Sequence, residues 1–351
     1  MNYPFHFNAA VLENNNSPLV IHKIKFEGPL KAGQVLVRLF YSGICGKQIE
    51  EIDGLGGADH YIPHLLGHEG SGEVLAVGPA VNKVKPGDTV VLHWMKGSGI
   101  HSETPYYESE GKRINAGWVT TFNEKAVVSE NRLTVIPKDF NMRLAPLFGC
   151  AVTTAFGVVN NDAKIKVGQS VLIFGVGGVG LNIAQAASMV SAYPIIGVDL
   201  HQNKLDLGKR FGLTHGVLAT SSNDIKKEIF NILGERGADA TIETTGNSRV
   251  IEQAYDFTSS EGKLILVGVT NKNDKISIYT LPLHFNKILT GSHGGNSVPD
   301  IDIPRYIRLI NSNKMTLENL ITHEFRLEQI NEALDLFRSG KAGRIIINMS
   351  S

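Results

Sequence analysis

Two cysteines and a histidine stand in short glycine-rich motifs and could together hold a metal ion. Cys45 lies in Ser-Gly-Ile-Cys-Gly, His68 in Gly-His-Glu-Gly, and Cys150 in Phe-Gly-Cys-Ala-Val-Thr-Thr. Two thiolates and an imidazole leave a tetrahedral Zn²⁺ one open position, which is typical of a catalytic rather than a structural site. Buried core thiols are the ordinary alternative for two free cysteines, and composition alone favours it. The surrounding motifs favour the metal site.

A glycine-rich loop supplies the second chemical signal. It follows an apolar segment, residues 170–174, that we expect to form a strand, and it opens a segment with helical spacing, residues 179–190. Glycines at the three positions of this motif permit a tight turn, the approach of a pyrophosphate, and close packing of helix on strand. The helix N-terminus then faces the phosphates. We expect cofactor binding at Gly175, Gly177, Gly178, Val179 and Gly180.

Asp199 lies at the end of the next apolar segment, residues 194–199. A carboxylate at this place in a strand–helix–strand unit accepts hydrogen bonds from the adenosine ribose hydroxyls. It also repels a 2′-phosphate. We therefore expect NAD as the cofactor, with NADP less favoured.

These candidate residues lie in parts of the sequence that have different patterns of apolar residues. The first ~150 residues contain short apolar runs broken by glycine and proline, such as residues 35–41 and 72–77, which indicates a compact β-rich domain. From about residue 155 strands alternate with helical segments, which indicates a parallel sheet. After about residue 297 the pattern changes again, to an amphipathic helix at 327–334 and a last strand at 344–347.

Composition narrows the function classes. Lys+Arg and Asp+Glu both number 34, so the formal net charge is zero and gives no electrostatic case for nucleic acid or an acidic membrane. No run of 18 apolar residues occurs, so we expect no membrane span. We see no signal peptide at the N-terminus. Two cysteines in 351 residues fit a reducing cytoplasm better than a disulfide framework.

Taken together, the motifs resemble those of the zinc-dependent medium-chain alcohol dehydrogenases. The resemblance runs through residues 43–46, 67–72, 86–88, 149–155, the glycine loop and 267–269. It implies an α/β architecture with a GroES-like β-rich catalytic domain, built from both chain ends, around an inserted Rossmann domain with a doubly wound parallel sheet. The implied boundaries are residues 1–154 and 297–351 for the catalytic domain and residues 155–296 for the NAD-binding domain.

The resemblance also implies roles for individual residues. Cys45, His68 and Cys150 would ligate the catalytic zinc, and Glu69 would be a neighbouring carboxylate or a transient ligand. The metal would bind the substrate oxygen as a Lewis acid, and hydride would pass to the nicotinamide. Further cofactor contacts would come from Thr154, Lys204, Val267, Gly268, Val269 and Arg344. Trp94 falls on a substrate-pocket position, with core packing as an equal alternative, and we expect His64 to be structural.

The chain departs from the family pattern in two places. Many relatives carry four clustered cysteines that bind a structural zinc, but residues 96–118 contain no cysteine. We therefore expect one zinc per chain. We also expect packing to hold this lobe, with Tyr106, Tyr107 and Trp118 as candidates.

The second departure concerns the proton relay. Relatives commonly place a hydroxyl residue two positions after the first cysteine to relay the substrate proton. Lys47 stands there instead. It could transfer the proton itself, bind an anionic or polyhydroxylated substrate, or simply turn to solvent or to a cofactor phosphate. Glu50 and Glu51 could pair with it locally.

The sequence thus predicts a zinc- and NAD-dependent dehydrogenase acting on an alcohol or polyol, such as a sugar, cyclitol or sugar derivative. A glutathione-dependent formaldehyde dehydrogenase-like enzyme is an alternative, suggested by residues 96–118 and 291–295. A zinc-free quinone or enoyl reductase and a non-catalytic NAD-binding protein would also fit the same fold. By resemblance to the family, we expect a homodimer or homotetramer formed through an edge strand within residues 276–290.

Overall fold

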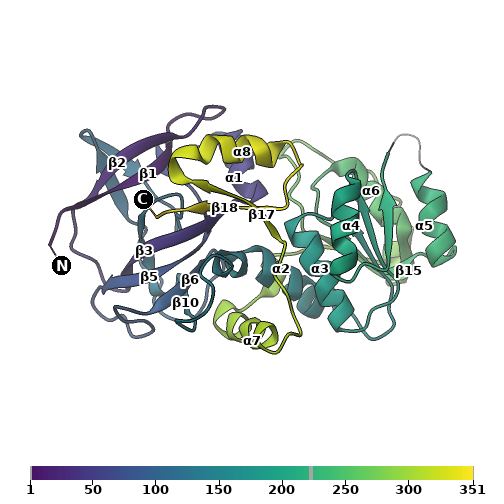
Figure 1. The fold of residues 1–351 in the computed structure, drawn as a ribbon. Coiled ribbons are helices and arrows are strands. Elements are labelled where there is room, and N and C mark those ends of the chain that lie inside the picture. Colours follow the sequence, from purple (N-terminus) through teal and green to yellow (C-terminus); the bar gives the residue numbers. More distant parts are fainter. Residues whose placement is uncertain (1, 221–223, 351) are drawn as a thin grey trace. The chain divides into compact units, whose positions relative to one another are not determined.

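Both ends of the chain contribute to one structural unit. The computed structural model describes residues 2–220 and 224–350. Residues 1–150 and 298–351 belong to the first unit, and residues 151–297 form the second. The second unit therefore begins at residue 151, within the segment that we assigned to the catalytic domain, because helix α2 starts there and packs on α3 of the same unit. In Figure 1 the last strand, β18, joins strands from the first third of the chain.

The first unit is built from short strands. Strands β1, β2, β7, β8 and β4 form a closed barrel, and a larger sheet has the order β10-β6-β5-β3-β18-β17, with β9 also paired to β3. The strands are β1 Phe5–Leu12, β2 Val20–Phe26, β3 Gln34–Gly43, β4 His64–Leu65, β5 Glu69–Val77, β6 Thr89–His93, β7 Tyr106–Ser109, β8 Lys112–Asn115, β9 Lys125–Ser129, β10 Leu133–Val135, β17 Ile321–Arg326 and β18 Arg344–Asn348.

Strand β3 is the centre of this unit because both of its faces are buried. Val35, Val37 and Leu39 pack into the core of the larger sheet, whereas Leu36 packs into the barrel core. Side chains alternate between the faces of a strand, so a continuous apolar run serves two cores at once. The helices of the unit are α1 Gly46–Ile52, η1 Glu130–Arg132, η2 Ala145–Gly149, α7 Pro299–Asn311, η6 Leu327–Gln329 and α8 Ile330–Arg338.

The second unit is a doubly wound α/β layer structure. Its six strands have the order β13-β12-β11-β14-β15-β16, and every pairing in this sheet is parallel. The strands are β11 Val171–Phe174, β12 Ile195–Asp199, β13 His215–Leu218, β14 Ala238–Glu243, β15 Thr258–Leu266 and β16 Ile288–Gly291. The helices are α2 Ala151–Gly157, η3 Val158–Ala163, α3 Gly178–Met189, α4 Gln202–Arg210, α5 Ile225–Leu233, α6 Ser248–Phe257, η4 Leu281–Phe285 and η5 Gly294–Asn296.

Burial explains why β11, a central strand of this sheet, is apolar throughout. All four residues of β11 are buried, as a strand covered by helices on both faces requires. The α/β fold class predicted from the sequence is thus confirmed, with its parallel sheet and its β-rich partner unit. Among the residues that the structure describes, no helix is both long and apolar enough to cross a membrane.

Candidate functional site

The structure brings Cys45, His68 and Cys150 together inside the first unit. One potential ligand atom of each lies within 4.8 Å of the others. Strands β3 and β5 pair antiparallel with Ser42 opposite Gly70, so the chain segments that carry Cys45 and His68 lie side by side. Cys150 follows η2 directly. Neither cysteine forms a disulfide bond. Among the residues that the structure describes, no other group of three or more potential ligands converges in this way.

Two glycines leave the space that this arrangement needs. A methyl group on Gly43 would overlap the Glu69 carboxylate, and one on Gly149 would overlap the Leu92 carbonyl oxygen and the Glu69 side chain. A larger residue at Gly149 would therefore force backbone atoms of Leu92 or Glu69 to move, and one at Gly43 would push the Glu69 side chain aside. By contrast, a methyl group on Gly46, next to Cys45, would meet no atom within 4 Å.

The electrostatics of the cluster favour a metal-binding thiolate. Contact with Cys150 lowers the pKa of Cys45 most strongly, the neighbouring His68 and the positive charge of Arg344 lower it further, and burial opposes them. The net pKa lies well below that of an ordinary thiol, and the thiolate is the form that binds metal. His68 Nε2 is buried and lacks a hydrogen-bond partner among the described residues, so no other protein group competes with a ligand for this nitrogen.

This donor set fits zinc. Two sulfurs and one imidazole nitrogen are the Cys2His ligands of a catalytic zinc site that keeps its fourth position open. The observation that supports the fit is chemical: among the described residues, a buried nitrogen without a partner faces two thiols, one of which has a lowered pKa. Zinc would satisfy all three groups at once.

Glu69 and Arg344 form a buried ion pair beside these ligands. Their exposed fractions are 0% and 4%, and the guanidinium contacts the carboxylate. Burial lowers the pKa of Arg344, and its interaction with Cys45 partly restores it. The structure therefore places Arg344 within the surroundings of the metal ligands. Its predicted contact with the cofactor stays a prediction.

Gln48 is a residue of this site that the sequence analysis did not identify. Its side chain is 1% exposed and contacts both Cys45 and His68. Its place in the sequence carries the signal that could have revealed it, because glutamine at the third position of a helix commonly bonds back to the residue that precedes the helix. Cys45 is that preceding residue for α1.

Lys47 does not join the three ligands in this arrangement. Its ammonium nitrogen lies 3.2 Å from Oε2 of Glu50, and its side chain is 47% exposed. The pairing with Glu50 is the local alternative considered for this position. His64 is also placed apart, because its Nε2 pairs with Asp59 at 2.8 Å and its Nδ1 lies 2.9 Å from the Leu65 carbonyl oxygen. Both ring nitrogens of His64 are thus engaged by groups other than the three candidate ligands, and its structural role stays a prediction.

The lobe at residues 96–118 is held by hydrogen bonds and aromatic contacts. The Glu130 carboxylate accepts hydrogen bonds from the backbone N–H groups of Ile100 at 2.8 Å, Asn82 at 3.0 Å and Lys83 at 3.1 Å. Tyr107 is buried, and its hydroxyl oxygen accepts a bond from the Val127 N–H at 3.0 Å. Packing and hydrogen bonding thus account for the order of this lobe.

Of the three aromatic residues proposed to hold the lobe, only Tyr107 is buried. Tyr106 and Trp118 are 52% and 58% exposed. Each of these two rings nevertheless forms a cation–π contact. The Arg113 guanidinium lies 4.5 Å from the centre of the Tyr106 ring, and the Arg132 guanidinium lies 5.0 Å from the centre of the Trp118 ring. Arg132 also donates to the backbone carbonyl of Trp94.

The glycine loop of the second unit has the geometry that its sequence predicted. Gly175 has a φ of +88°, which disfavours any other residue, and Gly177 immediately precedes α3. A methyl group on Gly180 would overlap the Gly175 carbonyl oxygen, so helix and loop touch here. Gly178 and Val179 form the first turn of α3 and leave its N-terminal amides free of side-chain caps.

Asp199 connects this loop to the next helix. One carboxylate oxygen accepts the Val176 N–H at 2.8 Å and the other accepts the His201 N–H at 2.9 Å. Lys204 lies in the first turn of α4, which begins just after this junction. The carboxylate is therefore fixed in position before any ligand arrives.

The remaining predicted cofactor residues lie on segments after β15 and in α2. Val267 and Gly268 donate their N–H groups to the Glu243 carbonyl oxygen, at 2.8 and 3.0 Å, and Val269 is 62% exposed. Thr154 is buried in α2. Glu243, which the sequence analysis missed, is fully buried, and its carboxylate accepts N–H bonds from Thr245 and Gly246. Burial raises its pKa despite these bonds.

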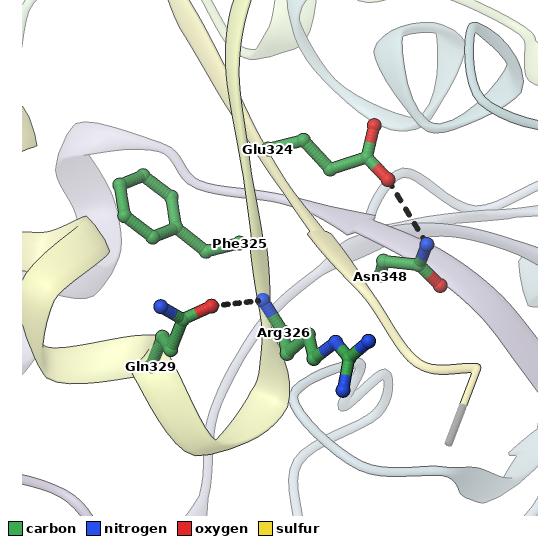
Figure 2. Close-up of a pocket in the computed structure, with 5 residues that line it drawn as sticks. All are labelled: Glu324, Phe325, Arg326, Gln329 and Asn348. Atoms are coloured by element: carbon green, nitrogen blue, oxygen red, sulfur yellow. Dashed lines mark hydrogen bonds between the residues drawn. The ribbon is translucent and has the colours of Figure 1, made fainter.

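A separate hollow lies on the surface of the first unit. Its volume is about 400 Å³, and Figure 2 shows the side chains around it. The Glu324 carboxylate accepts a bond from the Asn348 amide at 2.9 Å, and the Gln329 amide oxygen accepts the Arg326 N–H at 3.2 Å. None of the predicted site residues lines it, so the hollow is distinct from the metal ligands.

Comparison with known proteins assigns both units to families. Residues 31–138 match the alcohol dehydrogenase GroES-like domain, and residues 178–312 match the zinc-binding dehydrogenase family. The chain is 32% identical to an alcohol dehydrogenase class-3 of Cereibacter sphaeroides, over 97% of this chain and 98% of that protein. It is 30% identical to an S-(hydroxymethyl)glutathione dehydrogenase of Paracoccus denitrificans, over the same shares.

Solved structures also show similarity to alcohol dehydrogenases. An alcohol dehydrogenase zinc-binding domain protein from Burkholderia ambifaria is 26% identical, with a TM-score of 0.90, over 99% of this chain and all of that one. The benzyl alcohol dehydrogenase of Acinetobacter calcoaceticus is also 26% identical, with a TM-score of 0.88 and the same coverage. With its matching domains, its relatives and its converging Cys45, His68 and Cys150, the chain belongs to the zinc-dependent medium-chain alcohol dehydrogenase family.

Proposed function

We propose that the protein transfers hydride between an alcohol carbon and the nicotinamide of NAD, with one catalytic zinc held by Cys45, His68 and Cys150. The convergence of these three ligand atoms within 4.8 Å carries the proposal. When bound, zinc supplies Lewis acidity that stabilises an alkoxide at neutral pH. The roles of the chain's own residues then follow from their positions.

Around the metal ligands, the protein controls charge and shape. The lowered pKa of Cys45 provides a thiolate without a strong base. Arg344 compensates the buried charge of Glu69, which keeps that carboxylate next to the ligands without an unpaired charge in the interior. We propose that Glu69 acts there as a neighbouring carboxylate or as a transient ligand.

In the second unit, the backbone does most of the cofactor binding. The N-terminal amides of α3 would bind the pyrophosphate, and the fixed carboxylate of Asp199 would accept the ribose hydroxyls and disfavour a 2′-phosphate. Backbone groups at residues 267–269 would bind the nicotinamide carboxamide, with Thr154 and Lys204 as further contacts. The hydride chemistry itself belongs to the cofactor.

We propose a polyhydroxylated or charged alcohol, such as a sugar, cyclitol or sugar derivative, as the substrate. Lys47 at the relay position supports this, since a cation in place of a hydroxyl suits such a substrate better than a simple primary alcohol. Its pairing with Glu50 leaves the lysine free to exchange partners, because surface ion pairs contribute little free energy.

The test combines metal analysis with turnover. We expect purified protein to contain close to one zinc per chain by mass spectrometry and to reduce NAD with at least one member of an alcohol and polyol panel. Cys150→Ala should lose both the zinc and the turnover. Protein that lacks zinc after growth with added zinc, or that shows no turnover on the panel, would contradict the proposal.

A second candidate substrate is the adduct of formaldehyde with glutathione. It is supported by similar proteins named S-(hydroxymethyl)glutathione dehydrogenase, including one of Haemophilus influenzae that is 32% identical over 97% of this chain. Formaldehyde and glutathione together, compared with each alone and with the polyol panel, separate the two candidates. A kcat/KM for the adduct at least tenfold above that for every polyol would select it.

We further propose that the protein assembles as a homodimer or homotetramer in the cytoplasm. Strand β16 is an edge of the parallel sheet, and the apolar side chains near it are exposed: Tyr279, Leu281, Leu283, Phe285 and Ile288. A strand edge bordered by exposed apolar residues invites pairing with a second copy. The two cysteines, neither of which forms a disulfide bond, support a reducing compartment.

A further inference from the structure

The side chain of Gln48 lies between two of the three metal ligands. Its Oε1 accepts the backbone N–H of Cys45 at 2.9 Å, and its Nε2 lies 2.6 Å from Nδ1 of His68. With 1% of its surface exposed, it has no solvent alternative for either contact. Each contact therefore constrains the other.

The backbone N–H of Cys45 fixes which way the amide faces. A backbone N–H can only donate, so the carbonyl oxygen of Gln48 must lie on the Cys45 side and its NH₂ group on the His68 side. The NH₂ group can only donate as well. His68 Nδ1 must then accept the bond, and it does so only when it carries no proton.

A neutral imidazole with an unprotonated Nδ1 carries its proton on Nε2. Nε2 of His68 is also the nitrogen left for the metal, because Nδ1 is occupied by Gln48 and Nε2 is buried without a hydrogen-bond partner among the described residues. The contact with Gln48 thus favours the tautomer whose metal-facing nitrogen is blocked by a proton.

We propose that Gln48 is a positioning residue that sets the tautomer of His68 and opposes metal binding, so that zinc loading reverses the orientation of its amide. The inference rests on the proposed zinc site. When Nε2 binds the metal, the proton moves to Nδ1, which becomes a donor and needs an acceptor. Gln48 can offer its oxygen there only by turning its amide, which places NH₂ against the Cys45 N–H and breaks that bond.

A carboxylate in place of the Gln48 amide could bond to Cys45 and to a protonated Nδ1 of His68 together. Its two oxygens can accept the Cys45 N–H and the His68 Nδ1–H at the same time, and groups that orient a metal-bound histidine commonly change metal affinity by roughly 10–100-fold. We therefore expect Gln48→Glu to lower the Kd for zinc by about tenfold or more. The measurement is competition against a chromophoric chelator at fixed pH, on the full chain.

A charge-matched control separates hydrogen bonding from simple electrostatics. Lys47→Gln changes the net charge next to Cys45 by the same amount as Gln48→Glu, but the Lys47 side chain is half exposed and pairs with Glu50 rather than with His68. Gln48→Glu should bind zinc more tightly than Lys47→Gln does. If the two variants bind zinc equally well, or Gln48→Glu binds it more weakly than the unaltered protein, the proposal is wrong.

The unaltered protein provides an independent readout that needs no variant. Imidazole ¹⁵N shifts, recorded with ¹⁵N-labelled histidine and assigned with His68→Gln, report which ring nitrogen carries the proton. We expect an unprotonated Nδ1 in metal-free protein and a protonated Nδ1 after zinc is added. A protonated Nδ1 before zinc addition would overturn the inference. Failure of the protein to bind zinc at all would instead reject the proposed function, so the two failures are distinguishable.

Discussion

At the scale of single residues, the three candidate metal ligands depend on neighbours that have no functional group. Gly43 and Gly149 carry no side chain, and each leaves room that a single methyl group would take from Glu69. Glu69 in turn is held by Arg344. The chemistry of two cysteines and a histidine therefore requires close packing around them, as in any protein interior of normal density.

Gly149 offers a direct test of this dependence. Gly149→Ala should lower the free energy of unfolding by about 1–3 kcal/mol, because overpacked methyl groups force neighbouring atoms to move, and it should reduce zinc content because Cys150 is the next residue. Urea unfolding and metal analysis measure the two effects. Gly46→Ala is the matched control, since its methyl group meets no atom within 4 Å. Equal stability of the two variants would contradict the packing argument.

Asp199 tests the cofactor preference at the same scale. Asp199→Asn keeps the size of the side chain but removes the charge, so repulsion of a 2′-phosphate is lost along with a charge-assisted bond of about 1.5–3 kcal/mol. We expect the ratio of kcat/KM for NADP to that for NAD to rise by roughly tenfold or more. Steady-state kinetics with both cofactors measures this ratio. An unchanged ratio would show that another residue selects the cofactor.

At the scale of elements, a three-residue turn organises the lobe that lacks cysteines. The short helix η1 contains Glu130, whose buried carboxylate accepts three backbone N–H bonds from two segments of the chain. Burial raises the pKa of Glu130, but these bonds outweigh it and leave the pKa below its usual value. One carboxylate thus ties the lobe to a neighbouring segment of the same unit.

Glu130→Gln should destabilise the protein in a pH-dependent way. Because the folded pKa of Glu130 is lowered, its contribution is complete above its unfolded pKa of about 4.3 and is lost as the pH falls through the folded value. We expect a loss of about 1–3 kcal/mol at pH 7 that shrinks below about pH 4. Unfolding in urea at several pH values measures it.

Glu103→Gln is the control for this experiment, because Glu103 belongs to the same lobe but forms only an exposed pair with Lys31. The free energy of unfolding of this variant should change far less than that of Glu130→Gln, because an exposed ion pair contributes little to stability. A Glu130→Gln loss that stayed constant from about pH 7 down to about pH 3 would show that the charge of the carboxylate is not what holds the lobe.

At the scale of the whole molecule, an open sheet edge predicts self-association. Strand β16 has a neighbour on one side only among the described residues, and Phe285 and Ile288 near it are 64% and 43% exposed. Introducing charge there, as Phe285→Glu with Ile288→Lys, should shift the protein towards monomers in analytical ultracentrifugation. Val167→Glu, at an 81% exposed position away from this edge, should leave the oligomer intact. An unaltered protein that sediments as a monomer would refute the proposal.

Much of the fold could be predicted because its signals are local. The period of apolar residues distinguished the β-rich part from the α/β part, and the glycine loop was located by a motif whose φ requirement at Gly175 only glycine meets readily. Both predicted strands at residues 35–41 and 344–347 lie within β3 and β18. The exact start of the second unit was not predictable, because it depends on which helix α2 packs against.

The sequence by itself determined which residues could do the chemistry. Two cysteines, one histidine and an acidic residue after a glycine loop can be recognised from their residue types and the motifs around them. Only the tertiary structure decided what surrounds them. The contact of Gln48 with His68 and the burial of Arg344 against Glu69 both depend on side-chain directions. Directions follow from packing between segments far apart in the chain, and no local pattern of residues records them.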